Sequence, residues 1–218
     1  MRTLYRAKFK EIGEKGDDRL AGRKVTVAGL GGIGSVVTSI LAREGFDLRI
    51  IDKGRVEEVD MSRMGLYQEQ DITKFKAKQA KFRTAEINPK LVLKSFHEEL
   101  GANNVFLVKA ECVIDTTNNR ETNELIFNYC QDEKIPIILA SYSGSTSEIL
   151  IATKKIPRKV FEDFVKKPSI EDVGAISPAT HAAAALVVSE LFKILLGKTS
   201  SKCISFDVWT GKYKEKKL

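Results

Sequence analysis

Cysteine is scarce in this sequence, and no long uninterrupted apolar run occurs in it. The three cysteines, at positions 112, 130 and 203, form no CxxC pair, which argues against a zinc ribbon and against a disulfide framework. The first residues include Arg2, Arg6 and Lys8 and do not form an apolar signal core. We therefore expect a protein of the reducing cytoplasm.

The most apolar stretch spans residues 182–196. It carries Glu190 and Lys193 and is shorter than a membrane span. It predicts a buried helix, so we expect no membrane contact.

The rest of the composition is that of an ordinary globular chain. The 218 residues (24.3 kDa) are 43% hydrophobic and 30% charged, which suits one well-cored domain. Lys and Arg number 36 against 29 acids, so the net charge is +7. This moderate excess favours an anionic partner such as a nucleotide, a nucleic acid or an acidic protein face.

Strand-like and helix-like segments alternate along the chain. Strands are predicted at 24–30, 48–52, 91–94, 111–115, 135–141, 146–152 and 204–208, and helices at 33–43, 75–87, 121–132 and 178–196. The alternation predicts an α/β fold, a doubly wound and mostly parallel Rossmann-like sheet with additional antiparallel strands toward the C-terminus. We expect a single domain over 1–218, with an amphipathic N-terminal arm at 1–23 and an exposed crossover loop at 153–177.

A glycine-rich loop, with Gly29, Gly31, Gly32 and Gly34, follows the first predicted strand and opens the first helix. Glycines there permit a tight turn and a close approach of phosphates, and the helix N-terminus offers unpaired amides. Asp52 ends the second strand, where a carboxylate accepts hydrogen bonds from ribose hydroxyls. The pattern predicts nucleotide binding. The alternative is that the glycines only allow close packing of helix against strand.

Polar residues spaced along the chain after Asp52 narrow this prediction. The motifs are, in chain order, the loop 29–35, Asp52, Val56-Glu57, Asp60, Arg63, Lys76, and the segments 85–89, 112–115 and 174–178. With this order the chain resembles the ThiF/MoeB/HesA family, the relatives of ubiquitin-activating enzymes, over nearly its whole length. It is most similar to the compact ThiF-type sulfur-carrier adenylyltransferases.

The resemblance implies an adenylyltransferase that joins AMP from ATP to the C-terminal glycine of a small ubiquitin-like or sulfur-carrier protein ending in Gly-Gly. It assigns the ribose to Asp52, and it assigns neutralisation of the triphosphate to Arg63 and Lys76 as catalytic residues. It also implies a homodimer, in which an arm arginine, Arg6 first, reaches the partner subunit's phosphates. The other implied nucleotide contacts are Gly29, Gly31, Gly32, Gly34, Asp60, Asn118 and Asn119, and the implied cofactors are ATP and Mg²⁺.

Several positions depart from the family pattern. Asn118 stands where the magnesium-binding aspartate is expected, so it would offer the metal only an uncharged carbonyl oxygen. Asn123 stands where an arginine is usual, and Val59-Asp60 replaces a serine–asparagine pair. Residues 153–177 contain no cysteine, so we expect an acyl-adenylate product and no enzyme thioester.

The sequence leaves alternatives open for Lys76 and for the function of the chain. Lys76 lies among other lysines, a pattern that is also typical of a solvated helix face. An ATP-dependent dehydratase of threonylcarbamoyl-adenosine in tRNA is compatible with the positive charge, although no aromatic–basic nucleic-acid motif accompanies it. A catalytically weakened nucleotide-binding partner subunit is compatible with Asn118 and Asn123. A nicotinamide oxidoreductase is disfavoured, because no second half with a catalytic acid or base is present.

Overall fold

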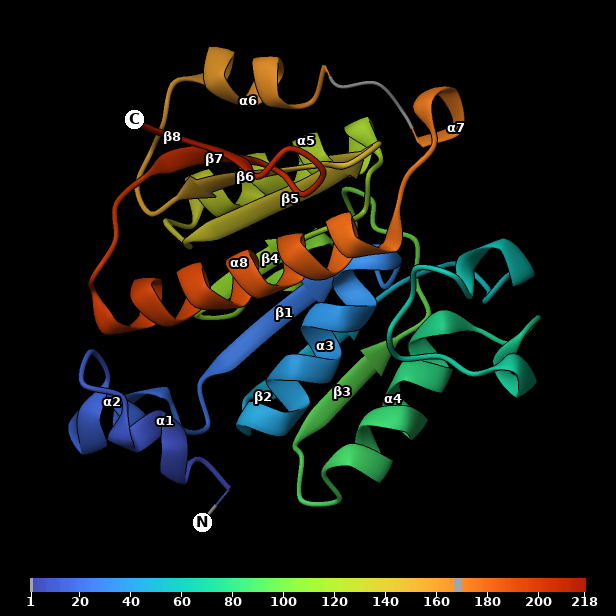
Figure 1. The fold of residues 1–218 in the computed structure, drawn as a ribbon, viewed down its shortest axis with the longest axis horizontal. Helices are drawn as coiled ribbons and strands as arrows, with labels where there is room; N and C mark the ends of the chain where they lie inside the picture. Colours follow the sequence, from blue (N-terminus) through green and yellow to red (C-terminus); the bar gives the residue numbers. More distant parts are fainter. Residues whose placement is uncertain (1, 167–169) are drawn as a thin grey trace.

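The computed structural model describes residues 2–166 and 170–218. Its strands form one eight-stranded sheet in the order β3-β2-β1-β4-β5-β6-β7-β8 (Figure 1). The strands are β1 (Lys24–Ala28), β2 (Asp47–Ile51), β3 (Leu93–Phe96), β4 (Cys112–Asp115), β5 (Ile137–Ser143), β6 (Thr146–Ala152), β7 (Lys202–Asp207) and β8 (Lys212–Lys217). β3, β2, β1, β4 and β5 are parallel, while β6, β7 and β8 each pair antiparallel. The predicted mixed α/β fold is therefore confirmed.

Helices cover both faces of the sheet. They are α1 (Leu4–Lys8), α2 (Gly13–Leu20), α3 (Gly32–Glu44), α4 (Lys76–Ile87), α5 (Arg120–Asp132), α6 (Arg158–Phe164), α7 (Ile170–Val173) and α8 (Ser177–Leu196). Short 3₁₀ turns lie between β2 and α4, namely η1 (Glu58–Asp60) and η2 (Glu69–Asp71), and between β3 and β4, namely η3 (Val105–Val108). In Figure 1, α3 and α8 lie side by side over one face of the sheet, and they pack against each other.

The alternation of side chains along the strands divides the core in two. On β4, Ile114 belongs to the cluster under α3 and α8, while its neighbour Val113 belongs to the cluster that includes Phe127 of α5. Ile138 and Ile137 divide in the same way on β5. Both faces of these central strands are buried, which explains why they read as continuous apolar runs in the sequence.

α8 is long and apolar enough to pass for a membrane span by length and composition, but half of its most apolar window is buried inside the protein. It packs against α3, β5 and β6. Its Glu190, 2% exposed, pairs with Lys193 at 2.7 Å and with Lys202 of β7 at 3.1 Å. The prediction of a buried helix is confirmed, and the apolar run is explained by core packing.

The strand order creates a crevice at the carboxyl edge of the sheet. The loop after β1 leads through α3 to β2 on one side, and the loop after β4 leads through α5 to β5 on the other. Neighbouring parallel strands whose connections leave in opposite directions open a ligand-binding crevice between the two loops. The glycine loop and residues 116–119 therefore face each other across the β1–β4 pair.

The predicted arm at 1–23 consists of two helices, α1 and α2, joined by a turn. Two other sequence expectations need correction. The crossover at 153–177 contains α6 and α7, although residues 167–169 of this prediction lie outside the described part of the chain. The strand predicted at 204–208 is not the last one, because the sheet ends in β8, whose residues are all exposed.

Candidate functional site

A cavity of about 270 Å³ opens at the carboxyl edge of the parallel strands. It lies in the crevice that the reversal of strand order creates. Its lining is drawn from the glycine loop, the loop after β2, the first residue of α4, the loop after β4, the end of β5, and α7. The lining residues are Gly29, Gly31, Gly32, Ile33, Asp52, Asp60, Arg63, Met64, Lys76, Thr116, Thr117, Asn118, Ala140, Ser141, Tyr142 and Ile170.

The four glycines of the loop differ in how much space a side chain would have at each position. Gly29 has φ +83°, and a Cβ there would lie 2.7 Å from the backbone carbon of Thr116. A Cβ on Gly34 would lie 1.9 Å from the Gly29 carbonyl oxygen, and one on Gly32 would lie 2.6 Å from the Tyr142 hydroxyl. Gly31 differs, since nothing comes closer to its hypothetical Cβ than the Met64 methyl at 3.9 Å. Packing therefore accounts for three of the glycines, and Gly31 is the one that leaves space in the cavity.

Asp52 ties the glycine loop to the loop after β2. Its Oδ2 accepts a hydrogen bond from the Leu30 amide and its Oδ1 accepts one from the Gly54 amide, both at 2.6 Å. A carboxylate has lone pairs for further donors, so these two bonds leave it acceptor capacity toward a ligand. Asp52 lines both the main cavity and an adjoining one.

The cationic part of the cavity is built from two elements. Arg63 follows η1, and Lys76 is the first residue of α4. Asp60, at the end of η1, joins them: its Oδ1 lies 2.7 Å from Arg63 Nη2 and its Oδ2 lies 2.9 Å from Lys76 Nζ. The three side chains are 5%, 20% and 14% exposed for Asp60, Arg63 and Lys76. Lys76 therefore does not lie on the solvated lysine-rich face that the sequence left open.

Tyr67 contributes to this arrangement and was missed by sequence reasoning. Its buried hydroxyl donates to the Leu30 carbonyl at 3.2 Å and lies 3.4 Å from the Lys76 carbonyl. Burial, together with the negative charges of Asp52 and Asp60, raises the pKa of Tyr67 well above its ordinary value. The phenol therefore stays protonated and holds the glycine loop beside α4.

The loop after β4 uses its polar side chains internally. Asp115, 1% exposed, accepts hydrogen bonds from the Thr117 amide (3.0 Å), the Thr117 hydroxyl (2.8 Å) and Asn123 Nδ2 (2.9 Å). Burial raises the pKa of Asp115, and these hydrogen bonds only partly offset it. Asn119 caps α5 by accepting from the Thr122 amide at 2.9 Å. Asn118, with φ +51°, is the asparagine of this loop that lines the main cavity.

A second cavity of about 220 Å³ adjoins the first and shares Gly29, Asp52 and Thr117 with it. It is lined mainly by apolar surface, including Ile51 and Leu100, and Asn119 lies at its wall. Lys53, Glu98 and Glu99 also line it, while Arg63 and Lys76 line the first cavity. The two cavities therefore differ in their lining and meet at the three shared residues.

Of the predicted site residues, Arg6 is the one that the structure does not bring to this edge of the sheet. Its Nε lies 2.5 Å from Asp17, and its Nη1 lies 2.9 Å from Glu44, at the far end of α3. The guanidinium is also within 6 Å of the Phe46 and Phe192 rings, at 5.9 and 5.8 Å. Within one chain its role is to dock the arm on the domain. The predicted action on a partner subunit would require these contacts to break.

The donor set does not fit a preformed magnesium site. Residues 2–166 and 170–218 contain no group of three or more His, Cys, Asp or Glu that could hold a metal ion. In the cavity, Asp52 is bonded to two amides and Asp60 to two cations. Asp115 is committed to its own loop and does not replace the aspartate absent at position 118.

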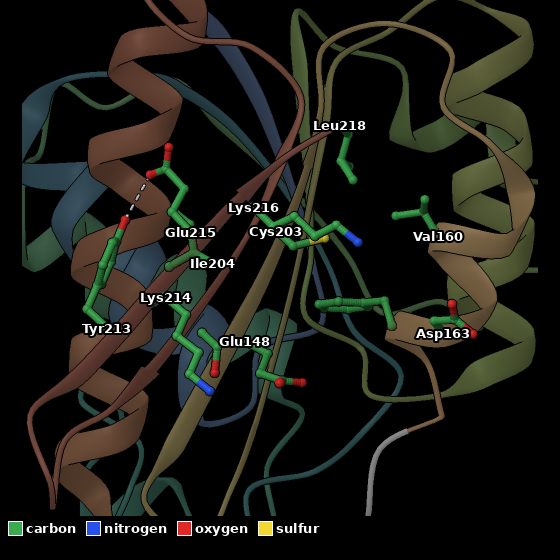
Figure 2. Close-up of a pocket in the computed structure, with 12 residues that line it drawn as sticks. Glu148, Val160, Asp163, Cys203, Ile204, Tyr213, Lys214, Glu215, Lys216 and Leu218 are labelled. Atoms are coloured by element: carbon green, nitrogen blue, oxygen red, sulfur yellow. Dashed lines mark hydrogen bonds between the residues drawn. The ribbon is translucent and has the colours of Figure 1, made fainter.

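A separate groove of about 700 Å³ lies between α6 and the antiparallel strands β6, β7 and β8 (Figure 2). Figure 2 shows Lys214 and Lys216 coming from β8, and Val160 and Asp163 from α6 on the other side of the groove. Glu148 and Cys203 also line the groove. None of the predicted nucleotide-binding residues contributes to it.

The chain is similar in sequence to known proteins over most of its length. The model of the ThiF family matches residues 5–218. The sulfur carrier protein ThiS adenylyltransferase of Bacillus subtilis is 26% identical over 95% of this chain and 65% of its own length. The SAMP-activating enzyme E1 of Haloferax volcanii is 25% identical over 85% of this chain and 72% of its own.

Solved structures show the same fold. Escherichia coli MccB, crystallised with ATP, has a TM-score of 0.76 at 21% identity, covering 93% of this chain and 65% of that one. PaaA has a TM-score of 0.78 at 22% identity, covering 93% and 66%. The chain thus spans about two thirds of the length of MccB, PaaA and the Bacillus protein.

Proposed function

The chain belongs to the ThiF family, and from that premise we propose that it is an ATP-dependent adenylyltransferase. Its substrate in this proposal is the C-terminal glycine of a small ubiquitin-like or sulfur-carrier protein that ends in Gly-Gly. The names of its relatives, which act on ThiS or on SAMP, support this class of substrate. The product is an acyl-adenylate.

One observation carries the proposal: Arg63 and Lys76, from two separate elements, converge beside the glycine loop and Asp52 in one cavity. In the reaction, the terminal carboxylate of the carrier forms a bond to the α-phosphorus of ATP. The bond from that phosphorus to the oxygen bridging the α- and β-phosphates breaks, and its electron pair leaves with pyrophosphate. Such a transfer depends on positioning and charge neutralisation more than on covalent help from the protein.

Five of the predicted residues have a role in this scheme. Arg63 and Lys76 neutralise the phosphates, and Gly31 lets the backbone approach them. Asp52, which lines both cavities, accepts from the ribose between them. The base lies in the second cavity against Leu100. Mg²⁺ would have to be supplied with the nucleotide, and Asn118 would offer it only the uncharged oxygen of its side-chain amide.

Cys112 and Cys130 support an acyl-adenylate and not an enzyme thioester, and the third cysteine, Cys203, lines the separate groove and not the main cavity. Burial raises the pKa of Cys112 to about 12 and also raises that of Cys130, so neither thiol ionises near neutral pH. Both side chains lie inside the core clusters. We propose that the activated carrier is released to a further reaction without becoming attached to this chain.

The test is ATP–pyrophosphate exchange in the presence of candidate carriers ending in Gly-Gly. Lys76→Ala is expected to abolish exchange, because it removes a cation of the cavity. Lys78→Ala is the matched control, since Lys78 lies on the same helix with its side chain exposed, and it is expected to retain exchange. The absence of exchange with every carrier, or equal behaviour of the two variants, would contradict the proposal.

A second candidate, a nucleotide-binding partner subunit with weak or no turnover, is favoured by the loop after β4. Asp115, the buried acid that ends β4, is bonded to Thr117 and Asn123, and Asn118 brings no charge to the cavity. Calorimetry with ATP separates the two candidates when read beside the exchange assay, because such a subunit binds the nucleotide without exchange. The proposed homodimer is tested independently by the mass of the protein in solution.

A further inference from the structure

Both cations of the main cavity share one carboxylate. Asp60 lies 2.7 Å from Arg63 Nη2 and 2.9 Å from Lys76 Nζ, and its side chain is 5% exposed. The carboxylate is fixed in place by η1, since its Oδ2 also accepts from the Glu57 amide at 3.3 Å as part of a capping box. It is therefore a built part of the site and not a mobile surface acid.

This carboxylate changes the charge that a ligand meets. The cavity lining contains two bases, Arg63 and Lys76, and two acids, Asp52 and Asp60, so its side-chain charges cancel. A free nucleotide polyphosphate carries several negative charges and gains little from a neutral lining. Without Asp60 the lining would carry one net positive charge.

Arg63 still has a donor to offer. Its Nη2 donates to Asp60 and its Nη1 to the Val59 carbonyl at 3.3 Å. Its Nε is buried and has no hydrogen-bond partner among residues 2–166 and 170–218. A buried N–H without an acceptor is costly, so the Arg63 guanidinium keeps donor capacity that Asp60 does not satisfy.

We propose that Asp60 is the residue that sets the polyphosphate affinity of this site. Its carboxylate pairs with both Arg63 and Lys76 and cancels one of their two charges, so a polyphosphate binds these cations in competition with it. This inference rests on the proposed nucleotide site and adds to it a residue that weakens binding of the more highly charged nucleotides.

The direction in which Asp60→Asn changes ATP affinity distinguishes a counter-charge from a residue that only positions the two cations. Asp60→Asn keeps an oxygen that accepts from the Glu57 amide and removes the charge. If Asp60 acts as a counter-charge, the variant binds ATP more tightly, by about tenfold, in the absence of divalent metal. The gain decreases from ATP to ADP to AMP, because it scales with ligand charge. If Asp60 only orients the two cations, the variant binds every nucleotide more weakly.

The measurement is calorimetric titration of the full chain with AMP, ADP, ATP and inorganic tripolyphosphate in EDTA. Glu58→Gln is the matched control, because it removes one acid from the same turn at an exposed position that takes no part in the capping box. It is expected to leave all four affinities within about twofold. Asp60→Ser is the second uncharged variant, and it is used if Asp60→Asn does not fold. A thermal melt of each variant confirms the folded state.

The titrations distinguish failure of the counter-charge inference from failure of the proposed nucleotide site. Unchanged or weaker ATP binding by both folded Asp60 variants overturns the inference, and so does a gain that is equal for AMP and ATP. Tighter binding of tripolyphosphate by the variants, with no preference for ATP over tripolyphosphate, supports the counter-charge and refutes the nucleotide proposal. No binding of any probe to wild type and variants refutes both.

Discussion

The ion pair between Asp71 and Arg83 fixes the loop that carries Asp60 and Arg63 onto α4, the helix that begins with Lys76. Arg83 Nε and Nη2 donate to the two carboxylate oxygens at 2.8 and 2.9 Å, with Asp71 1% and Arg83 6% exposed. Asp71 ends η2, which lies in the same loop as Asp60 and Arg63. Arg83 lies two helical turns after Lys76 on α4. Asp71→Asn is therefore expected to loosen the site as well as the fold.

The expected loss of unfolding free energy depends on the contacts that remain after Asp71→Asn. Removing one partner of a buried ion pair costs about 3–5 kcal/mol of unfolding free energy, because the other charge stays buried. Here Arg83 keeps its contact with Glu86 at 3.0 Å, and Asn keeps an acceptor for the Gln68 amide. The lower end, about 3 kcal/mol, is expected, which corresponds to a fall in Tm of roughly 6 to 12 °C for a chain of this size.

The pH dependence gives the same prediction a second readout. Burial by itself raises the pKa of Asp71, but the hydrogen bonds from Arg83 and Gln68 outweigh it and lower that pKa below its ordinary value. The stabilisation is therefore present above the unfolded-state pKa, near pH 4, and is lost as the pH falls through the folded-state value. Asp71→Asn removes this contribution, so the acid limb of its stability profile is flatter.

The assay is urea unfolding followed by circular dichroism at pH 7 and at intervals down to pH 3. Glu86→Gln is the control, because the Glu86 side chain is 52% exposed and its pair with Arg83 is expected to contribute less than about 1 kcal/mol. A loss at pH 7 smaller than about 1 kcal/mol for Asp71→Asn would refute the reasoning. So would equal losses for the two variants.

Three further predictions concern the acid limb, the glycine loop and the thiols. Glu190→Gln is expected to flatten the acid limb of the stability profile as well. Ion pairs with Lys193 and Lys202 hold the pKa of Glu190 low despite its burial, and their stabilisation is lost on acidification. Urea midpoints at pH 7 and pH 3 measure how much stability each protein loses. Gly31→Ala should keep its Tm within a few degrees of wild type and lose ATP affinity. Gly34→Ala should have a much lower Tm, because its Cβ would meet the Gly29 carbonyl oxygen. A Tm for Gly34→Ala equal to that of wild type would contradict this steric argument. Cys112 and Cys130 should resist alkylation at pH 8 until urea unfolds the chain, and mass spectrometry of the native protein should find both unmodified.

The regular part of the fold was readable because local patterns and burial agree there. Buried strands give continuous apolar runs, and Gly197, with φ +71° after α8, ends that helix where the sequence predicted. β8 was missed because its residues, Lys212–Lys217, are all exposed and show no apolar alternation. It is a strand because its backbone pairs with β7, and that pairing leaves no pattern in the side chains.

The sequence alone determined the family resemblance, the alternating α/β order and the set of polar residues at the strand ends, since these depend on residue type and spacing along the chain. Tertiary structure alone decided how these residues divide their bonds. It placed Asp60 between Arg63 and Lys76, tied Asp115 to its own loop, and held Arg6 at the far end of α3. The reason is physical: which donor meets which acceptor depends on how loops distant in sequence pack together, and ångström differences in that packing decide which charges are cancelled before any ligand arrives.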